Sequence, residues 1–326
     1  MFENKLTIVP LDTTHLEDAS ILFAAAYGSC RLTVPDLPER WADNQKALNK
    51  LQMFIKKGSG LAAITGGRLV GYLGWYHVPD FRDSGKAAAY VPEWAHAADE
   101  TIKTEVYRAL YRAAAELWHA QGVKTHALSY TAGNPWMEQF WFWNGFGLLV
   151  VDAVRTLDPL PVKPVSELVI KKAGLEDTGS VLILEIEHWQ HYLKAPIFMN
   201  PHGAITAEEI QPFIGTENNA YFLAEYAGQP AGMMKFEPAS TGATDLVDAQ
   251  TTIAITGAYV RPEFRGLGIA PSLLNSALRH YAEQGRQYCS VDFESFNPEA
   301  AAFWMKHFKP ICYSVFRVPE TSLQPG

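Results

Sequence analysis

Residues 259–270 read YVRPEFRGLGIA and mark the point where a predicted strand ends and a predicted helix, residues 268–284, begins. The first N–H groups of a helix have no partner within the helix, and the helix dipole adds partial positive charge at that end. Gly266 and Gly268 lack a Cβ, so a phosphate group can approach this backbone closely. Arg265 adds a side chain that forms charge-assisted hydrogen bonds. The stretch therefore predicts an anion site between a strand and a helix.

The chain also repeats itself. Asn134-Pro135 precedes Phe140, and Asn297-Pro298 precedes Phe303, so the two copies of this pattern lie 297 − 134 = 163 residues apart. Two further pairs of stretches recur in the same order: GRLVGYLGW at 67–75 with GQPAGMMKF at 228–236, and AYVPE at 89–93 with AYVRPE at 258–263. Landmarks that recur in one order at a nearly constant separation indicate two related halves.

The segment DPLPVKP, residues 158–164, separates the halves. Three prolines in seven residues cannot continue a helix or a central strand. We therefore predict one domain at 1–157, a linker at 158–165 and a second domain at 166–326. In both halves, predicted strands are joined through helices, which predicts an α/β fold with a mixed, partly parallel sheet covered on both faces.

The composition is that of an ordinary globular protein, with 48% hydrophobic and 19% charged residues among 326. The net charge of −8 argues against nucleic-acid binding, which needs clustered Lys and Arg. The N-terminus lacks the apolar core of a signal peptide, and no stretch approaches the roughly 18 apolar residues of a membrane span. The three cysteines form no metal-type pair. We therefore expect a cytoplasmic protein without a metal, a nucleic-acid partner or a membrane partner.

The string from Arg265 to Ala270, after a strand ending V-R-P, resembles motif A of the GNAT acetyltransferase superfamily. The loop lacks the Lys-Ser/Thr of a P-loop and the third glycine of a Rossmann loop. The resemblance extends through Asn297 and Phe303, covers about residues 167–318, and reaches the first half only through the repeat. It implies two tandem domains of this fold. It also implies an acyl-CoA donor, acetyl-CoA by default, whose acyl group passes to an amine.

The same resemblance implies a set of CoA-binding residues. In the family, backbone N–H groups at a bulge in the fourth strand polarise the thioester carbonyl, and Gly257 suits such a bulge. Asn297 is also an ordinary N-cap residue, and both roles can coexist. The expected CoA-binding residues are Ala258, Tyr259, Val260, Arg265, Gly266, Leu267, Gly268, Ile269, Ala270, Asn297 and Phe303.

The first half departs from this pattern at the equivalent place. After Pro92-Glu93 it continues without an arginine or a glycine, and Asp99 and Glu100 stand where a pyrophosphate would lie. Like charges repel there. We therefore expect residues 1–157 not to bind CoA in this way and to shape the acceptor cleft or replace a second subunit.

Carboxylates distinguish the fifth strand of the second half. Asp292 and Glu294 share one face of this strand by two-residue alternation, whereas the first half has Ser129 and Thr131 at the same offset. Two carboxylates on a central strand are costly if they are buried without partners. Glu294 lies nearest the C-terminal end of the strand and is our candidate base, directly or through water. Glu237 and a purely structural role are the alternatives.

The acid does not follow from the resemblance. Trp304 occupies the position where many relatives have a tyrosine, and an indole N–H is a poor proton donor. Tyr313 is our candidate acid. Tyr288, Ser295 and departure of the thiolate into water remain alternatives.

We expect direct transfer in a ternary complex, because no cysteine or serine is arranged as a covalent nucleophile. The acceptor is a small-molecule amine or a peptide. The alternatives are a non-catalytic acyl-CoA sensor or scaffold and a protein or peptide N-acetyltransferase, and a monomer and a homodimer both remain open. His188 and His191 read as an aromatic cluster bordering the acceptor, not as a metal site.

Overall fold

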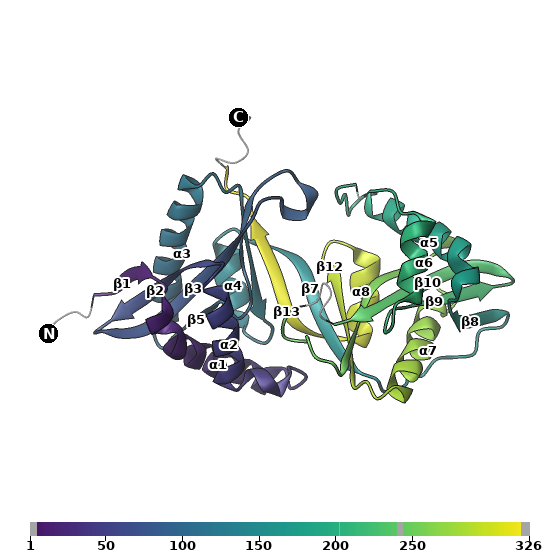
Figure 1. The fold of residues 1–326 in the computed structure, drawn as a ribbon, viewed down its shortest axis with the longest axis horizontal. Helices are drawn as coiled ribbons and strands as arrows, with labels where there is room; N and C mark the ends of the chain where they lie inside the picture. The colour runs from purple at the N-terminus through teal and green to yellow at the C-terminus, as the bar shows by residue number, and fades with distance from the viewer. Residues whose placement is uncertain (1–4, 202, 240–243, 321–326) are drawn as a thin grey trace. The chain divides into compact units, whose positions relative to one another are not determined.

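The computed structural model describes residues 5–201, 203–239 and 244–320 (Figure 1). The chain forms two units. The first runs to Val151 and takes in the chain from Ile311 onward, and the second is Asp152–Pro310. Residues 157–165, which include the predicted linker, contain neither helix nor strand. None of the helices in the described ranges is long and apolar enough to cross a membrane.

The first unit is built on a mixed sheet with the strand order β1-β2-β3-β4-β6-β13, and β5 pairs with β3 beside it. Strands β4 and β6 run parallel, and the other described pairs in this unit are antiparallel. Its elements are β1 (Thr7–Pro10), α1 (Leu16–Thr33), α2 (Asn44–Phe54), β2 (Ser59–Thr65), β3 (Arg68–Val78), β4 (Ala88–Val91), β5 (His96–Ala98), α3 (Lys103–Ala120), β6 (Thr125–Thr131), α4 (Pro135–Trp143) and β13 (Lys309–Arg317).

The last strand of the chain, β13, belongs to the first unit. It pairs antiparallel with β6, and the hydroxyl groups of Ser314 and Ser129 are hydrogen-bonded at 2.7 Å. Arg317 also donates to the hydroxyl of Tyr111 at 3.2 Å. The units therefore differ here from the boundary drawn from the sequence, which assigned all of 166–326 to one domain. The physical reason is that β13 pairs with β6, which lies far away in the sequence, and the local pattern of residues does not indicate this pairing.

The second unit has the strand order β12-β11-β10-β9-β8, with β7 on the other side of β12. Strands β11 and β12 run parallel, and β8 to β11 pair antiparallel with their neighbours. Its elements are β7 (Gly147–Thr156, which leads in from the first unit), β8 (Leu168–Lys172), α5 (Thr178–Tyr192), α6 (Ala207–Gly215), β9 (Ala220–Tyr226), β10 (Gln229–Pro238), β11 (Thr252–Val260), α7 (Ile269–Glu283), β12 (Tyr288–Glu294) and α8 (Pro298–His307).

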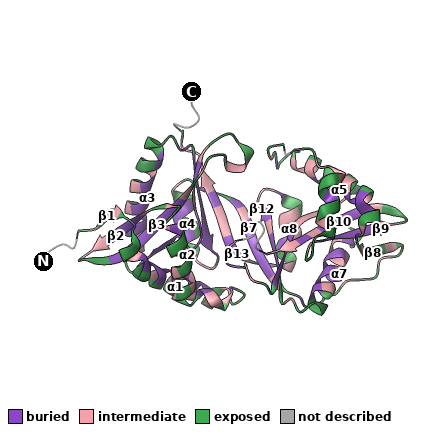
Figure 2. Cartoon of the chain, in the orientation of Figure 1, coloured by how far each residue is buried: buried purple, intermediate pink, exposed green. Residues whose placement is uncertain are grey.

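Helices cover both faces of the second sheet, as alternation along its strands requires. Tyr221 and Leu223 of β9 pack with Leu184 of α5, on the face that α5 and α6 cover. Phe222, between them, points to the opposite face and contacts Tyr281 of α7. Figure 1 shows α7 on the side of the sheet opposite α5 and α6, and Figure 2 shows buried and intermediate residues along β9 and β10 between these layers.

The helix predicted at 268–284 is present as α7, Ile269–Glu283. Its predicted apolar stripe is buried throughout and consists of Ile269, Leu273, Ala277, Leu278 and Tyr281. This stripe holds α7 against the sheet and so fixes the position of the loop that precedes it.

Candidate active site

Strands β11 and β12 separate before they end. Their described pairing runs from Thr252 opposite Tyr288 to Ile255 opposite Val291, although β11 continues to Val260. On the other side of β11 the register with β10 shifts, so that Thr256 is an extra residue between Ile255 and Gly257. A bulge next to a separating pair turns backbone groups of β11 toward open space. The bulge expected at Gly257 is thus present one residue before it.

A cavity of about 740 Å³ opens where the strands part. Its walls come from β11 and β12, from the loop before α7, and from α5 and α8. Of the residues expected to bind CoA, the following line it: Ala258, Tyr259, Val260, Arg265, Gly266, Gly268, Ile269, Ala270, Asn297 and Phe303. Leu267 is not among them, and its side chain is 43% exposed.

The loop before α7 has the backbone that an anion site needs. Gly266 and Gly268 have φ angles of +78° and +87°, in the left-handed region that favours glycine. Gly268 is the N-cap, and no side chain caps the first turn of α7. Arg265 donates from Nε to the carbonyl of Val260 at 3.1 Å, and its Nη1 lies 3.4 Å from Glu299. The two glycines and the contacts of Arg265 therefore set the backbone path of this loop.

Helix α8 closes another wall of the cavity. Asn297 is its N-cap, and its side-chain oxygen accepts from the backbone N–H of Ala300 at 3.2 Å. Phe303 and Trp304 both line the cavity, and their rings contact each other edge to face at 4.7 Å. Trp304 is buried, so an indole stands at this part of the wall.

The predicted base and acid lie in different units. Glu294 and Asp292 both line the cavity, as two-residue alternation on β12 requires. Tyr313 is on β13 in the first unit, where its backbone pairs with that of Tyr130, and it is not a lining residue. Burial raises the pKa of Tyr313. The alternative base Glu237 accepts a hydrogen bond from Thr256 and is likewise not a lining residue.

Helix α5 contributes a group that the sequence reasoning missed. Glu185 and His188 lie three residues apart on one side of this helix, and both are 5% exposed. The hydroxyl of Tyr221 donates to Oε1 of Glu185 at 2.7 Å, and Nδ1 of His188 lies 3.6 Å from Oε2. Burial alone would raise the pKa of the Glu185 carboxyl, but His188 and the hydrogen bond from Tyr221 bring it below its ordinary value. The sequence did carry one sign of this pair, because Glu185 precedes His188 by three residues and so shares its side of the helix.

The first unit fills the equivalent place with protein. After Pro92 the chain forms β5, which pairs with β3 so that His96 lies opposite Leu73. Both ring nitrogens of His96 have partners, the hydroxyl of Tyr107 at 2.8 Å and the carbonyl of Ser129 at 2.9 Å. Burial lowers the pKa of His96 to about 4. A buried strand thus stands where the second unit has an open glycine loop.

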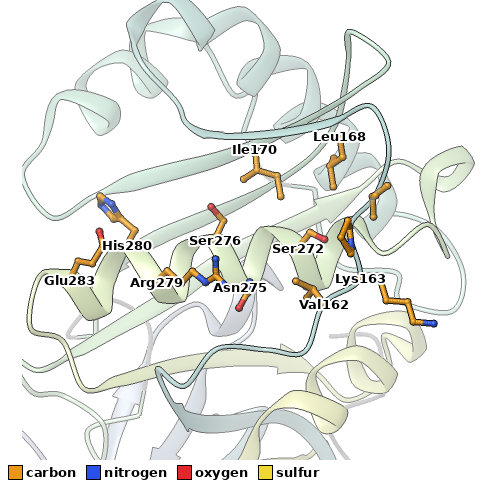
Figure 3. A pocket seen from close by; sticks show the side chains of 12 residues that line it. Val162, Lys163, Leu168, Ile170, Ser272, Asn275, Ser276, Arg279, His280 and Glu283 are labelled. Carbon is orange, nitrogen blue, oxygen red and sulfur yellow. The ribbon is translucent and has the colours of Figure 1, made fainter.

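A second hollow of the second unit, about 560 Å³, lies between α7 and the segment before β8. Figure 3 shows Ser272, Asn275 and Arg279 of α7 beside Val162 and Lys163 of that segment. It contains none of the predicted site residues. Within the described part of the chain, no group of three His, Cys, Asp or Glu side chains could hold a metal ion.

Comparisons with known proteins agree with this geometry. Residues 185–308 match the model of the acetyltransferase (GNAT) family. This part of the chain is a GNAT domain. The GNAT domain contains both separating strands, the glycine loop and α8, and it indicates an acyltransferase in general terms. No curated protein matches the sequence significantly.

Solved structures resemble this chain well beyond the GNAT domain. A GCN5-related N-acetyltransferase from Sphaerobacter thermophilus matches 100% of this chain and 98% of its own, with a TM-score of 0.61 and 13% identity. A GCN5-related glucosamine N-acetyltransferase region of a fungal multi-domain GH3 β-N-acetylglucosaminidase matches 97% of this chain and 38% of its own, with a TM-score of 0.57 and 13% identity. At this identity the likeness concerns the fold. The predicted α/β fold, with two domains of the GNAT fold in tandem, is confirmed.

Proposed function

We propose that the second unit transfers an acyl group, acetyl by default, from acyl-CoA to an amine. The observation that carries this proposal is the single cavity in which the Arg265 to Ala270 loop, the separated edge of β11 and the carboxylates of β12 meet. A site with these three parts can hold a pyrophosphate, align an extended thioester and attract a cationic amine.

The donor binds along β11 in this proposal. Its pyrophosphate accepts hydrogen bonds from the first turn of α7, and Arg265 and Lys306, which both line the cavity, supply positive charge. The backbone from Thr256 to Val260 aligns the pantetheine arm, and an N–H group at the bulge polarises the thioester carbonyl. Asn297 holds α8 in place and faces the same ligand.

The reaction is direct attack within a ternary complex. The amine nitrogen attacks the carbonyl carbon, the new C–N bond forms, the C–S bond breaks, and CoA leaves as a thiolate that takes up a proton. The amine must lose a proton, and Glu294 is one cavity residue that can accept it. Tyr313 as the acid stays a prediction from the sequence. The acceptor is a small-molecule amine or a peptide, and the protein acts in the cytoplasm.

The proposal divides function as the sequence suggested. The second unit, Asp152–Pro310, holds the acyl-CoA site, and residues 1–157 hold none of this type, because the chain after Pro92 forms β5 in place of a glycine loop. A second candidate function, a non-catalytic acyl-CoA sensor, is favoured by the buried Trp304 in the wall where many relatives have a tyrosine. Turnover with a panel of amines separates the two.

The first test is isothermal titration of acetyl-CoA into the wild-type protein and an Arg265→Glu, Gly268→Asp double variant. We expect one site in the wild type and loss of binding in the variant. The matched control is Arg279→Glu, Gly285→Asp, which makes the same changes of charge at the other end of α7, outside the cavity. Unchanged binding in the first variant would move the donor site elsewhere.

A further inference from the structure

A buried acid and a histidine lie on the α5 side of the cavity. Glu185 and His188 are both 95% buried, and a charged group in such a place is costly unless it is paired. Tyr221 pairs with one carboxylate oxygen of Glu185, and His188 faces the other. Nδ1 of His188 has no hydrogen-bond partner among the described residues. Buried polar atoms are rarely left this way in a purely structural cluster.

His188 lies against the strand position where the chemistry is proposed to occur. It lines the cavity, and a Cβ added at Gly257 would lie 3.7 Å from its Cε1 atom. Gly257 follows the bulge at Thr256, where β11 turns backbone groups toward the thioester. Gly257 and the imidazole of His188 are thus neighbours where α5 packs on β11.

Several titratable and charged groups surround the imidazole. The titratable and charged groups that face His188, directly or through Glu185, are Glu185, His191 and Tyr192 on α5, Tyr259 on β11, Tyr221 on β9 and Lys235 on β10. The carboxylate of Glu185 is the nearest charge. An anion at Nδ1 stabilises the imidazolium that forms when the ring accepts a proton at its other nitrogen.

We propose that His188 is the catalytic base of the acyl transfer, that Glu185 positions it, and that Tyr221 holds Glu185. This rests on the function proposed above and names the group that takes the proton. Nδ1–H donates toward Glu185, which leaves the lone pair of Nε2 for the acceptor. As the amine nitrogen bonds to the acyl carbon and the C–S bond breaks, its proton passes to Nε2. The imidazolium then returns that proton to the leaving thiolate or to solvent.

Glu294 has a different role in this arrangement. It lies on β12, across the parted strands, and its carboxylate attracts the ammonium form of the acceptor, which gives one proton to solvent before the neutral amine attacks. The distance from Nδ1 of His188 to Glu185 is longer than a direct hydrogen bond, and catalytic hydrogen bonds commonly shorten only when the ligands are bound.

The test uses the full chain with acetyl-CoA and 2-phenylethylamine, an amine whose ring suits the Trp189 and Tyr192 side of the cavity. Release of CoA thiol is measured against pH with this amine and with water alone. We expect His188→Gln to lower kcat roughly 10²- to 10³-fold, the range of a lost general base, while the Kd for acetyl-CoA stays unchanged. The variant should also lose the rise of rate with pH.

Glu185→Gln distinguishes positioning from structural support. It should lower kcat by less than His188→Gln and leave the Kd for acetyl-CoA unchanged, because the ring stays in place but loses the carboxylate that orients Nδ1. His280→Gln, on α7 outside the cavity, is the matched control and should leave the rate and profile unchanged.

Each outcome decides between the proposals. A His188→Gln variant with wild-type kcat and pH profile, or a Glu294→Gln variant that alone loses the rising limb, would overturn the assignment. Acetyl-CoA binding by the wild type without thiol release, both with 2-phenylethylamine and with every member of the amine panel, would overturn it in favour of the sensor. Failure of the wild type to bind acetyl-CoA would instead remove the proposed function.

Discussion

The hydroxyl groups of Ser129 and Ser314 lie 2.7 Å apart although 185 residues separate them in the chain. Ser129 belongs to β6 and Ser314 to β13, so the end of the chain completes a sheet that its beginning started. The first unit therefore includes the strand β13.

Removing this pairing should destabilise the first unit. Ser314→Pro removes a ladder donor and should lower the free energy of unfolding by about 3 kcal/mol, whereas Ser314→Ala should lower it by about 1 kcal/mol. Seven of the nine tryptophans precede residue 152, so tryptophan fluorescence during urea unfolding reports mainly on this unit. Ser29→Ala, at an exposed site on α1, is the control. A Ser314→Pro variant as stable as wild type would mean that β13 contributes little.

Two glycines with the same left-handed backbone allow the effect of a substitution on CoA binding to be distinguished from its effect on stability. Gly266 and Gly285 have the same φ of +78°, and no atom lies within 4 Å of a Cβ added to either. Changing either glycine to alanine should cost roughly 1–2 kcal/mol of stability. Only Gly266→Ala should weaken acetyl-CoA binding, by about tenfold, because its methyl group stands where the phosphates approach. Equal affinities in titration calorimetry would contradict a phosphate site at Gly266.

The internal repeat places an asparagine N-cap at the start of both α4 and α8, so one can serve as the control for the other. Asn297 and Asn134 each accept a hydrogen bond at 3.2 Å from the backbone N–H three residues on. Each change to alanine should cost about 1 kcal/mol in thermal unfolding. Asn297→Ala alone should raise the Kd for acetyl-CoA, and Asn297→Ser should restore the cap. If both alanine variants bind acetyl-CoA like the wild type, Asn297 acts only as a cap.

The stability of the first unit should fall in mild acid. Burial lowers the pKa of both His96 and His126 to about 4, below the ordinary value of 6.5. Between these values the unfolded chain binds protons that the folded chain does not, so stability is full above pH 6.5 and is lost as pH falls toward 4. Urea unfolding at pH 7 and pH 5 measures this loss.

The variant His96→Gln tests the origin of that loss. It removes one of the two buried groups, so the difference in unfolding free energy between pH 7 and pH 5 should shrink, even though stability at pH 7 also falls. An unchanged difference would assign the acid sensitivity to groups other than His96.

The sequence by itself determined what depends on neighbouring residues. The loop from Arg265 to Gly268 could be predicted because the conformation of a glycine and the unpaired N–H groups of a helix terminus depend on only a few neighbouring residues. The helix and strand periods determine which side chains share a face. For this reason the sequence predicted both the apolar stripe of α7 and the shared face of Asp292 and Glu294.

Only the tertiary structure decided which distant elements meet. It paired β13 with β6, filled the first unit's equivalent of the loop with β5, and brought Tyr221 of β9 to Glu185 of α5. The sequence placed Glu185 three residues before His188, but it did not show that Tyr221 and Gly257, which belong to two different strands, would lie beside them. Contacts between residues far apart in the chain depend on the packing of whole elements, and no local pattern of residues records that packing.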